Sequence, residues 1–420
     1  MAEYRPRIVD AELTERLGYS GAVLIEGARA CGKTETARRH AGSTAFFDEP
    51  QTQRAAELDP TLVLGGDTPR LLDEWQLVPA IWNAVRREVD NRQSGGQFIL
   101  TGSATPADDL TRHSGAGRFS RLRMRPMSLV ESGDSTGAVS LSALLAGESD
   151  VGAATNLTIN DLAELACRGG WPGGLDYGIT AAMGRVRDYI AEISRADVPA
   201  LDDKRRDPVR VQAVLSAVAR NVATEAGPNT LARDAGTLMG TAQLRVETVS
   251  TYLSALERLM VLEFQPHWGP HLRSRSTVRS SPKLHFVDPS LALAALRAGP
   301  ADLRKDVEFF GLVFESLVIR DLRVYAQGFR GEVRHYRDST GLEVDAIVTA
   351  GADRWAAFEV KLGASPAITD SAAAKLLKFA DRVDTQRSGA PAALVVVTGT
   401  GYGYRRPDGV LVVPIGALGP

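Results

Sequence analysis

The sequence predicts an α/β protein built from three parts: a parallel-sheet core, a helical middle region and a second α/β unit. Three observations support this prediction. The glycine-rich loop "GARACGKT" (27–34) lies between an apolar strand and a helix. Apolar residues recur at helical spacing in much of the stretch from 181 to 259. A long amphipathic helix (309–326) is followed by alternating strands at 332–338, 342–350 and 355–363.

Composition narrows the class of protein. A chain of 420 residues, 44% apolar and 24% charged, is typical of a globular protein with two or three domains. The net charge of -2 does not indicate nucleic-acid binding, although a local basic patch stays possible. No apolar run is long enough for a membrane span, and the first residues lack the core of a secretory signal. Two cysteines, Cys31 and Cys167, favour a reducing, cytoplasmic location.

Composition shifts and helical patterns predict four segments. A stretch rich in Gly, Ser, Ala and Thr at 134–160 is typical of a linker or lid. We therefore expect a nucleotide-binding core at 1–135, a linker and helical lid at 136–200, a helical region at 201–285 and an α/β domain at 286–420.

The glycine-rich loop has the pattern G-x-x-x-x-G-K-[ST], which is typical of phosphate binding. Glycines allow tight turns whose amide hydrogens point at a phosphate, at the N-terminus of the following helix. Lys33 is expected to contact the β- and γ-phosphates, and Thr34 to hold Mg²⁺. The predicted cofactor is ATP with Mg²⁺. The residues expected to contact ATP in this loop are Gly27, Ala28, Arg29, Ala30, Cys31, Gly32, Lys33, Thr34 and Glu35.

Two later strands supply candidate partners of this loop. In "PRLLDEWQ" (69–76), Asp73 is expected to bind Mg²⁺ and Glu74 to polarise the attacking water, although an ordinary acidic helix start is the alternative. In "QFILTGSA" (97–104), Thr101 and Ser103 could orient the water or sense the γ-phosphate. The alternative for these two residues is a turn or a helix cap.

A run of arginines follows. Arg121, Arg123 and Arg125 alternate, so on a strand they share one face. One arginine of this region could reach the γ-phosphate of a neighbouring subunit as a finger, and Arg118 is the first choice. A solvated strand face is the alternative for each.

Taken in order, these motifs resemble bacterial and archaeal AAA+-type ATPases that carry a C-terminal domain of unclassified function. The resemblance extends over nearly the whole chain, and it implies ATP hydrolysis, with a homo-oligomer, most often a hexamer, as the expected assembly. Cys31 departs from the usual loop; it is either a small buried residue or an oxidation-sensitive thiol. The motifs are "GARACGKT", "FFDEPQTQRAA", "LLDEWQLVP", "FILTGSA", "GRFSRLRMRPMSLVE", "CRGGWPGG", "LHFVDPSLA" and "FFGLVFESLV".

The middle region carries a pattern of helix, break, helix and strand at 229–265. This is the pattern of a winged helix-turn-helix with residues 245–257 as the recognition helix, and a helical lid is the alternative. A basic loop follows, which suits contacts with DNA phosphates, or is simply solvated. Its cations are Arg273, Arg275, Arg279 and Lys283. DNA is therefore the predicted partner, beside ATP, and no membrane is expected.

The last third resembles the core of the PD-(D/E)xK nucleases, a restriction-endonuclease-like fold. Asp345 is followed on the next strand by Glu359 and Lys361 in an E-x-K pattern. The resemblance implies that Asp345 and Glu359 share a divalent ion, that Lys361 helps deprotonate water, and that Glu315 assists the metal site. Glu343 is expected on the opposite face of its strand, with a structural role.

Two functional hypotheses follow. In the first, the protein is a Mg²⁺-dependent ATPase that controls a nuclease acting on DNA. In the second, it is an ATP-driven switch or remodeller whose inactive nuclease fold binds nucleic acid or a protein partner.

Overall fold

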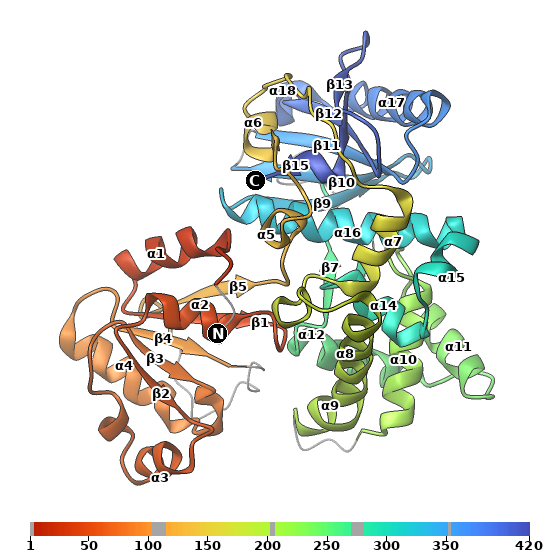
Figure 1. Ribbon diagram of the computed structural model, residues 1–420. Helices are drawn as coiled ribbons and strands as arrows, with labels where there is room; N and C mark the ends of the chain where they lie inside the picture. Colours follow the sequence, from red (N-terminus) through yellow and green to blue (C-terminus); the bar gives the residue numbers. More distant parts are fainter. Residues whose placement is uncertain (1–3, 103–114, 202–205, 270–280, 352–353) are drawn as a thin grey trace.

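The computed structural model describes residues 4–102, 115–201, 206–269, 281–351 and 354–420. Ser103 and the loop arginines Arg273, Arg275 and Arg279 lie outside these ranges. Figure 1 shows an N-terminal α/β unit, a helical region beside it, and a C-terminal α/β unit stacked against both. None of the helices within the described ranges has the length and apolar character needed to cross a membrane.

The N-terminal unit is a five-stranded parallel sheet in the order β2-β3-β4-β1-β5. This arrangement is consistent with the predicted core of a nucleotide-binding AAA-type domain. Apolar side chains fill both faces of the sheet, as parallel sheets require. The strands are β1 (Ala22–Gly27), β2 (Ser43–Phe46), β3 (Arg70–Asp73), β4 (Phe98–Thr101) and β5 (Phe119–Met124). The helices are α1 (Val9–Tyr19), α2 (Lys33–His40), α3 (Pro50–Leu58) and α4 (Ala80–Arg92).

The middle region is helical and contains a two-stranded antiparallel ribbon, β7 (Leu262–Gln265) with β8 (Lys283–Phe286). The predicted helix at 245–257 is present as α12 (Val246–Arg258). Its apolar face is buried, and its exposed positions include Glu247 and Glu257. The other helices of this region are α7 (Ile159–Arg168), α8 (Ile179–Glu192), α9 (Val198–Ala200), α10 (Pro208–Arg220), α11 (Pro228–Leu238), α14 (Pro289–Leu296) and α15 (Pro300–Lys305).

The C-terminal unit is a six-stranded mixed sheet in the order β13-β14-β12-β11-β10-β9. The helix α16 (Val307–Gln327) covers one face and α17 (Pro366–Ala380) covers the other. Strands β9, β10 and β11 form an antiparallel meander, and β12 joins β11 in parallel. The strands are β9 (Glu332–Arg337), β10 (Glu343–Ala350), β11 (Arg354–Lys361), β12 (Ala393–Thr398), β13 (Tyr404–Arg405) and β14 (Leu411–Pro414).

The stretch predicted as a linker or lid contains ordered structure. The short strand β6 (Val139–Ser140) pairs with β15 (Leu418–Gly419), and α6 (Leu141–Leu145) packs into the core of the C-terminal unit. Figure 1 shows α6 beside the strands of that unit. Small residues weaken the hydrophobic periodicity of this stretch. The buried side chains of Val139, Leu141 and Leu144 nevertheless pack it against the C-terminal unit.

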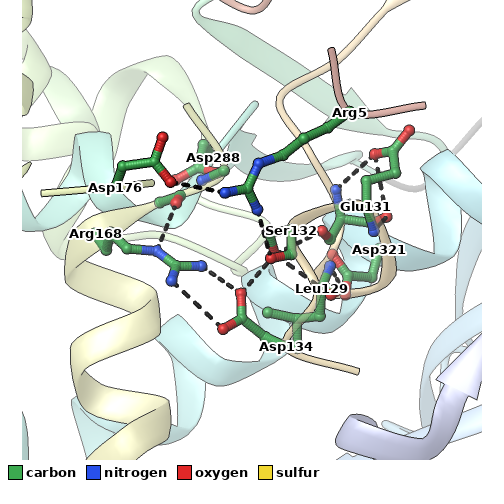
Figure 2. A network of polar contacts seen from close by, with 12 residues as sticks. Arg5, Leu129, Glu131, Ser132, Asp134, Arg168, Asp176, Asp288 and Asp321 are labelled. Atoms are coloured by element: carbon green, nitrogen blue, oxygen red, sulfur yellow. Dashed lines mark hydrogen bonds and ion pairs between the residues drawn. The ribbon is translucent and has the colours of Figure 1, made fainter. Parts of the chain in front are cut away.

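A polar network joins the three parts of the molecule (Figure 2). The carboxylate of Asp288, in "LHFVDPSLA", accepts from the backbone N–H of Gly170, in "CRGGWPGG", at 2.9 Å, and from Arg320 of α16 at 2.9 Å. Arg320 also pairs with Asp321, which accepts from the backbone N–H of Leu129 at 3.1 Å. Both carboxylates are fully buried, and they share the single guanidinium of Arg320, with backbone N–H groups as further donors. Two motifs of the sequence resemblance therefore have a structural role.

Candidate functional site

The glycine-rich loop connects β1 to α2, as the sequence predicts. A side chain at Gly27 would meet the carbonyl oxygen of Met124 at 2.2 Å, so only glycine fits there. Gly32 has a φ of 107°, which side chains rarely adopt, and it caps α2 at its N-terminus. The loop therefore ends at the positive pole of a helix, where an anion is favoured.

Lys33, Thr34, Asp73 and Thr101 gather at the carboxyl ends of β1, β3 and β4. The Lys33 ammonium donates to the carbonyl oxygens of Gly27 and Ala28, both at 2.9 Å. The Thr34 hydroxyl donates to Asp73 Oδ1 at 2.9 Å, and the Thr101 hydroxyl donates to the same oxygen. Burial raises the pKa of Asp73, and these two hydroxyl groups oppose that rise. The predicted order of motifs thus brings four candidate residues together.

The oxygens in this group suit Mg²⁺, which prefers hydroxyl and carboxylate ligands and retains water. Thr34 and Asp73 already lie within hydrogen-bonding distance of each other. Their chemistry therefore fits a magnesium ion bound beside a nucleotide.

Glu74 follows β3 in a left-handed conformation with a φ of 55°. Its carboxylate accepts from the side-chain amide of Gln76. The carboxylate is thus held at the strand end, next to the buried Asp73. The alternative of an acidic start to an ordinary helix does not describe this turn, because Glu74 precedes only the short 3-10 turn Trp75–Leu77.

Arg7 is a part of the site that sequence reasoning missed. Its guanidinium donates to the loop carbonyl of Cys31 at 2.9 Å and to the carbonyl of Arg125 at 2.7 Å, and it pairs with Glu131 at 3.0 Å. It is buried and fixes the loop against the end of β5. Nothing in its neighbourhood in the sequence distinguishes it from a solvated arginine. Cys31 itself is fully buried, which agrees with a packing role.

The middle of the glycine-rich loop, at residues 29 and 30, borders the helical region. Arg29 and Ala30 are exposed, and Arg29 pairs with Asp197 at 3.2 Å. Next to them lies a cleft of about 360 Å³, lined in part by Trp171 and Tyr189, whose rings are 4.9 Å apart. Glu35, by contrast, is exposed and pairs with Arg38 at 3.3 Å, so it contributes little to the loop.

The four arginines of the 118–125 run have different surroundings. Arg118 precedes β5, is 42% exposed and pairs with Asp90 at 2.9 Å. Arg121 pairs with Glu26. Arg123 and Arg125 both face Glu263 of β7, with Arg125 at 2.6 Å. Arg121, Arg123 and Arg125 line one cleft, so the predicted shared face is present.

A second polar cluster lies in the C-terminal unit, and an ammonium group sits at its centre. Lys283 Nζ is 2.7 Å from Glu315 Oε1, 2.7 Å from Glu343 Oε1 and 3.6 Å from Asp345 Oδ1. The Lys283 side chain is 2% exposed and comes from β8 of the middle region. One lysine therefore joins the ribbon of the middle region to three carboxylates of the C-terminal unit.

Glu359 and Lys361 form the adjacent half of this cluster. Glu359 is fully buried, and its Oε1 accepts from Lys361 at 2.8 Å and from Lys375 of α17 at 2.7 Å. Asp345 accepts from the backbone N–H of Val360 at 2.8 Å, which places it beside the E-x-K segment. The structure thus brings all four predicted nuclease-type residues into one region. Lys283 and Lys375 had no sequence signal that could assign them to it.

The pKa shifts show how the cluster balances its charge. Burial raises the pKa of Glu315 to about 8, and the neighbouring Lys283 ammonium opposes that rise. Burial would lower the pKa of Lys283, but Glu315, Asp345 and Glu343 outweigh it and raise the pKa. Burial would raise the pKa of Asp345, but Lys283 and the other lysines lower it. Three ammonium groups, those of Lys283, Lys361 and Lys375, therefore face the acidic side chains of the cluster.

This arrangement does not fit a divalent ion between Glu315 and Asp345, because an ammonium already occupies the space where their oxygens converge. Within the described ranges, no group of three or more His, Cys, Asp or Glu residues has the geometry to hold a metal ion. A metal would have to displace a buried lysine that three carboxylates stabilise.

Two expectations from the sequence were wrong. Glu343 does not point to the opposite face: residues two apart share a face of a strand, so Glu343 and Asp345 both reach Lys283. Lys283 does not belong to a solvated, phosphate-contacting loop, because it is buried among carboxylates. A lysine at the start of a strand looks exposed in sequence, and only the fold supplies its partners.

Comparisons with known proteins divide the chain into three matched stretches. Residues 19–132 match an AAA domain. Residues 159–302 match a domain of unknown function (DUF8612), and residues 310–418 match another (DUF4143). An AAA domain with the sheet described above supports ATPase activity. The predicted resemblance to AAA-type ATPases with a C-terminal domain of unclassified function is thus confirmed at this level, and none of these matches names a nuclease.

Whole-length relatives are distant. Uncharacterised proteins of Mycobacterium bovis and Mycobacterium tuberculosis are each 26% identical over 421 aligned residues, which cover 96% of this chain and 82% of the relative. A solved structure of Drosophila ORC bound to DNA aligns at 13% identity over 69% of this chain and 85% of that chain, with a TM-score of 0.18. A likeness this weak carries no argument about fold or ligand.

Proposed function

We propose that this protein is an ATP-hydrolysing switch whose C-terminal unit binds a partner without cutting it. The AAA domain supports the first half of this proposal. The second half rests on one observation: the Lys283 ammonium lies 2.7 Å from Glu315 and 3.6 Å from Asp345, two of the carboxylates that were expected to serve the metal.

In the ATPase half, Lys33 turns from the carbonyls of Gly27 and Ala28 to the β- and γ-phosphates of ATP. Thr34 and Asp73 would hold Mg²⁺, which would supply charge neutralisation at the phosphates. Glu74 polarises the attacking water, and Thr101 keeps Asp73 oriented through its hydroxyl group. The base of ATP fits the cleft between Arg29 and the Trp171–Tyr189 pair.

Phosphate release from ATP tests this half. Lys33→Ala should abolish tight binding of ATP, since a phosphate-facing cation is lost. Lys305→Ala, at an exposed position in α15, is the matched control and should keep near-normal turnover. Equal turnover of Lys33→Ala and wild type would refute the assignment.

We further propose that the active state is a homo-oligomer, with a hexamer favoured, in which Arg118 serves the nucleotide of a neighbouring subunit. Arg118 lies at the start of β5, whereas the loop of its own subunit lies beyond the end of that strand. Six strand residues separate these points by roughly 20 Å, so Arg118 cannot reach its own nucleotide. Light scattering with ATP tests this assembly; a strict monomer with normal turnover would exclude it.

A nuclease acting on DNA is the second candidate for the C-terminal unit. The meander of β9 to β11, the parallel β12 and the clustered Asp345, Glu359 and Lys361 favour it. Incubation with single- and double-stranded DNA or RNA and Mg²⁺ or Mn²⁺ separates the two candidates. We expect no cleavage; cleavage that disappears in Asp345→Asn would establish the nuclease instead.

The partner of the switch is DNA or a protein. The exposed side of α12 carries Glu247 and Glu257, which would repel DNA phosphates, so this helix favours a protein contact. Nucleic-acid binding by the whole chain is tested by titrating labelled DNA at several salt concentrations, with and without ATP. An affinity that falls steeply with salt indicates DNA; undetectable binding at low salt indicates a protein partner.

A further inference from the structure

A cleft of about 400 Å³ lies where the three parts of the molecule meet. Its walls come from α1 and β5 of the N-terminal unit, β7 of the middle region, and α16 and β9 of the C-terminal unit. Figure 1 shows α1 and β5 on the side of the N-terminal unit that faces α16. Seven arginines and three glutamates are among its lining residues. The cleft is separate from the glycine-rich loop and from the Lys283 cluster.

Most of the arginines around this cleft have a carboxylate of their own. Four of the seven arginines are paired in this way. They are Arg16 with Glu12, Arg121 with Glu26, Arg330 with Glu15, and Arg334 with Glu332.

The remaining three arginines share a single carboxylate, that of Glu263. Arg125 contacts it at 2.6 Å, Arg323 at 3.6 Å and Arg123 at 3.7 Å. The Glu263 side chain is only 11% exposed, so water screens these charges weakly. Three guanidinium groups share this one carboxylate, and Glu12, which also acts on Arg125, is itself paired with Arg16, so positive charge is in excess among the described residues at this point.

Arg323 shows the consequence of this excess most clearly. Its side chain is 6% exposed, and its Nη2 is buried with no hydrogen-bond partner in the described part of the chain. A buried, unpaired donor of this kind is costly unless a ligand or water satisfies it. Burial lowers the pKa of Arg323 to about 10, with Arg125 and Arg123 adding to this effect against Glu263. An anion bound in the cleft would accept a hydrogen bond from Arg323 and would offset the excess positive charge.

We propose that this cleft binds a small phosphate-bearing ligand, with Arg123 and Arg323 as its principal contacts. Guanidinium groups bind phosphate oxygens in a planar, bidentate manner, and the cleft has the volume of a small-molecule site. Arg123, at 37% exposure, forms the open side of the group, and Arg323 forms its buried side. Because three parts of the molecule contribute to its walls, the bound ligand holds them together.

Pyrophosphate is the probe, and the Lys33→Ala protein is the background, because it removes phosphate binding at the glycine-rich loop. Isothermal titration calorimetry at low salt should show one binding site. Arg123→Gln should weaken binding about tenfold or more, as expected for the loss of one charge-assisted contact. Arg54→Gln, on exposed α3 of the same unit, is the matched control and should bind within about twofold of its parent. Arg323→Gln provides a second variant, with circular dichroism to verify its folding.

Pyrophosphate binding in the Lys33→Ala background that depends on Arg123 supports the proposal, whatever the outcome of the ATPase assay. Absence of binding at millimolar pyrophosphate would overturn it, and so would equal affinity of Arg123→Gln and Arg54→Gln. A short single-stranded oligonucleotide forms the second arm. Arginine-dependent binding of the oligonucleotide without any binding of pyrophosphate would assign the cleft to nucleic acid and refute a small-ligand site.

Discussion

The loop site of the N-terminal unit and the carboxylate cluster of the C-terminal unit use the same kinds of residue in opposite ways. Among the described residues of the loop site, Lys33 donates to two neutral carbonyls, and Asp73 accepts from two neutral hydroxyls. In the cluster, Lys283 contacts carboxylates and Glu359 contacts lysines. The charges of the first site are therefore available to a ligand, whereas those of the second are already neutralised within the protein.

This difference teaches that residue types and spacing do not by themselves define a reactive site. An E-x-K pattern beside an aspartate suits metal catalysis only if no internal cation occupies the metal position. Substitution of the internal cation, Lys283, and of the carboxylates Glu74 and Glu315 tests this difference between the two sites.

The largest expected effect is that of Lys283→Met. Three carboxylates would lose the cation that compensates them, and removal of one partner from a buried ion group costs about 3 to 5 kcal/mol. Urea unfolding of the full chain measures this loss. Lys305→Met, at an exposed position in α15, is the control and should change stability by less than about 0.5 kcal/mol. A loss below about 1 kcal/mol in Lys283→Met would mean that the cluster is not internally neutralised.

Glu74→Gln should reduce ATP hydrolysis by about 10² to 10³, because the water-polarising carboxylate is lost. Binding of ATP should persist, since Lys33 and the loop are unchanged. Single-turnover assays with a fluorescent ATP analogue separate binding from hydrolysis, and Glu57→Gln on exposed α3 serves as the control. Wild-type hydrolysis in Glu74→Gln would show that the N-terminal site does not work as proposed.

Glu315→Gln should change how stability depends on pH. The folded pKa of Glu315 is about 8, above the ordinary value of 4.5, so its contribution is complete below pH 4.5 and is lost as pH rises through 8. The amide side chain of the variant does not ionise, so the variant lacks this contribution to the pH dependence. The difference in unfolding free energy, wild type minus variant, should therefore fall between pH 5 and 8, by at most about 1.4 kcal/mol per pH unit. A difference that is constant with pH would place the proton elsewhere.

Lys375→Gln should have the smallest effect, about 1 kcal/mol, because the Lys375 side chain is 31% exposed and Lys361 remains to compensate Glu359. Lys378→Gln, three residues along the same helix and exposed, should be neutral. Thermal unfolding compares the two. Equal midpoints would indicate that Lys361 alone balances Glu359.

The sequence predicted the loop site well because its signals are local. The glycine pattern, the strand before it and the helix after it are continuous in the chain, and parallel strands bring Asp73 and Thr101 to the same edge. The contacts within the loop site, and the conformation of Glu74, then follow from backbone geometry.

Elsewhere the missing information was non-local. Arg7 reaches the loop from the N-terminal segment, and Lys283 reaches Asp345 from a ribbon of the middle region. Neither contact produces a periodic pattern in the sequence, because a single charged residue has the same sequence neighbours whether it is solvated or buried. Glu343 is a different case: strand geometry alone would have placed it beside Asp345.

The pairing of β6 with β15 has a consequence for the order of folding. Ser140 bonds to a residue 280 positions later, so residues 139–145 cannot complete their packing until the far end of the C-terminal sheet has been synthesised. The N-terminal sheet, whose strands all lie between Ala22 and Met124, has no such delay. During synthesis we expect the nucleotide-binding unit to form early, while the apolar side chains of α6 remain exposed to solvent. Contacts of such long sequence separation are slow to form, which makes this interval the point at which the nascent chain depends most on chaperones.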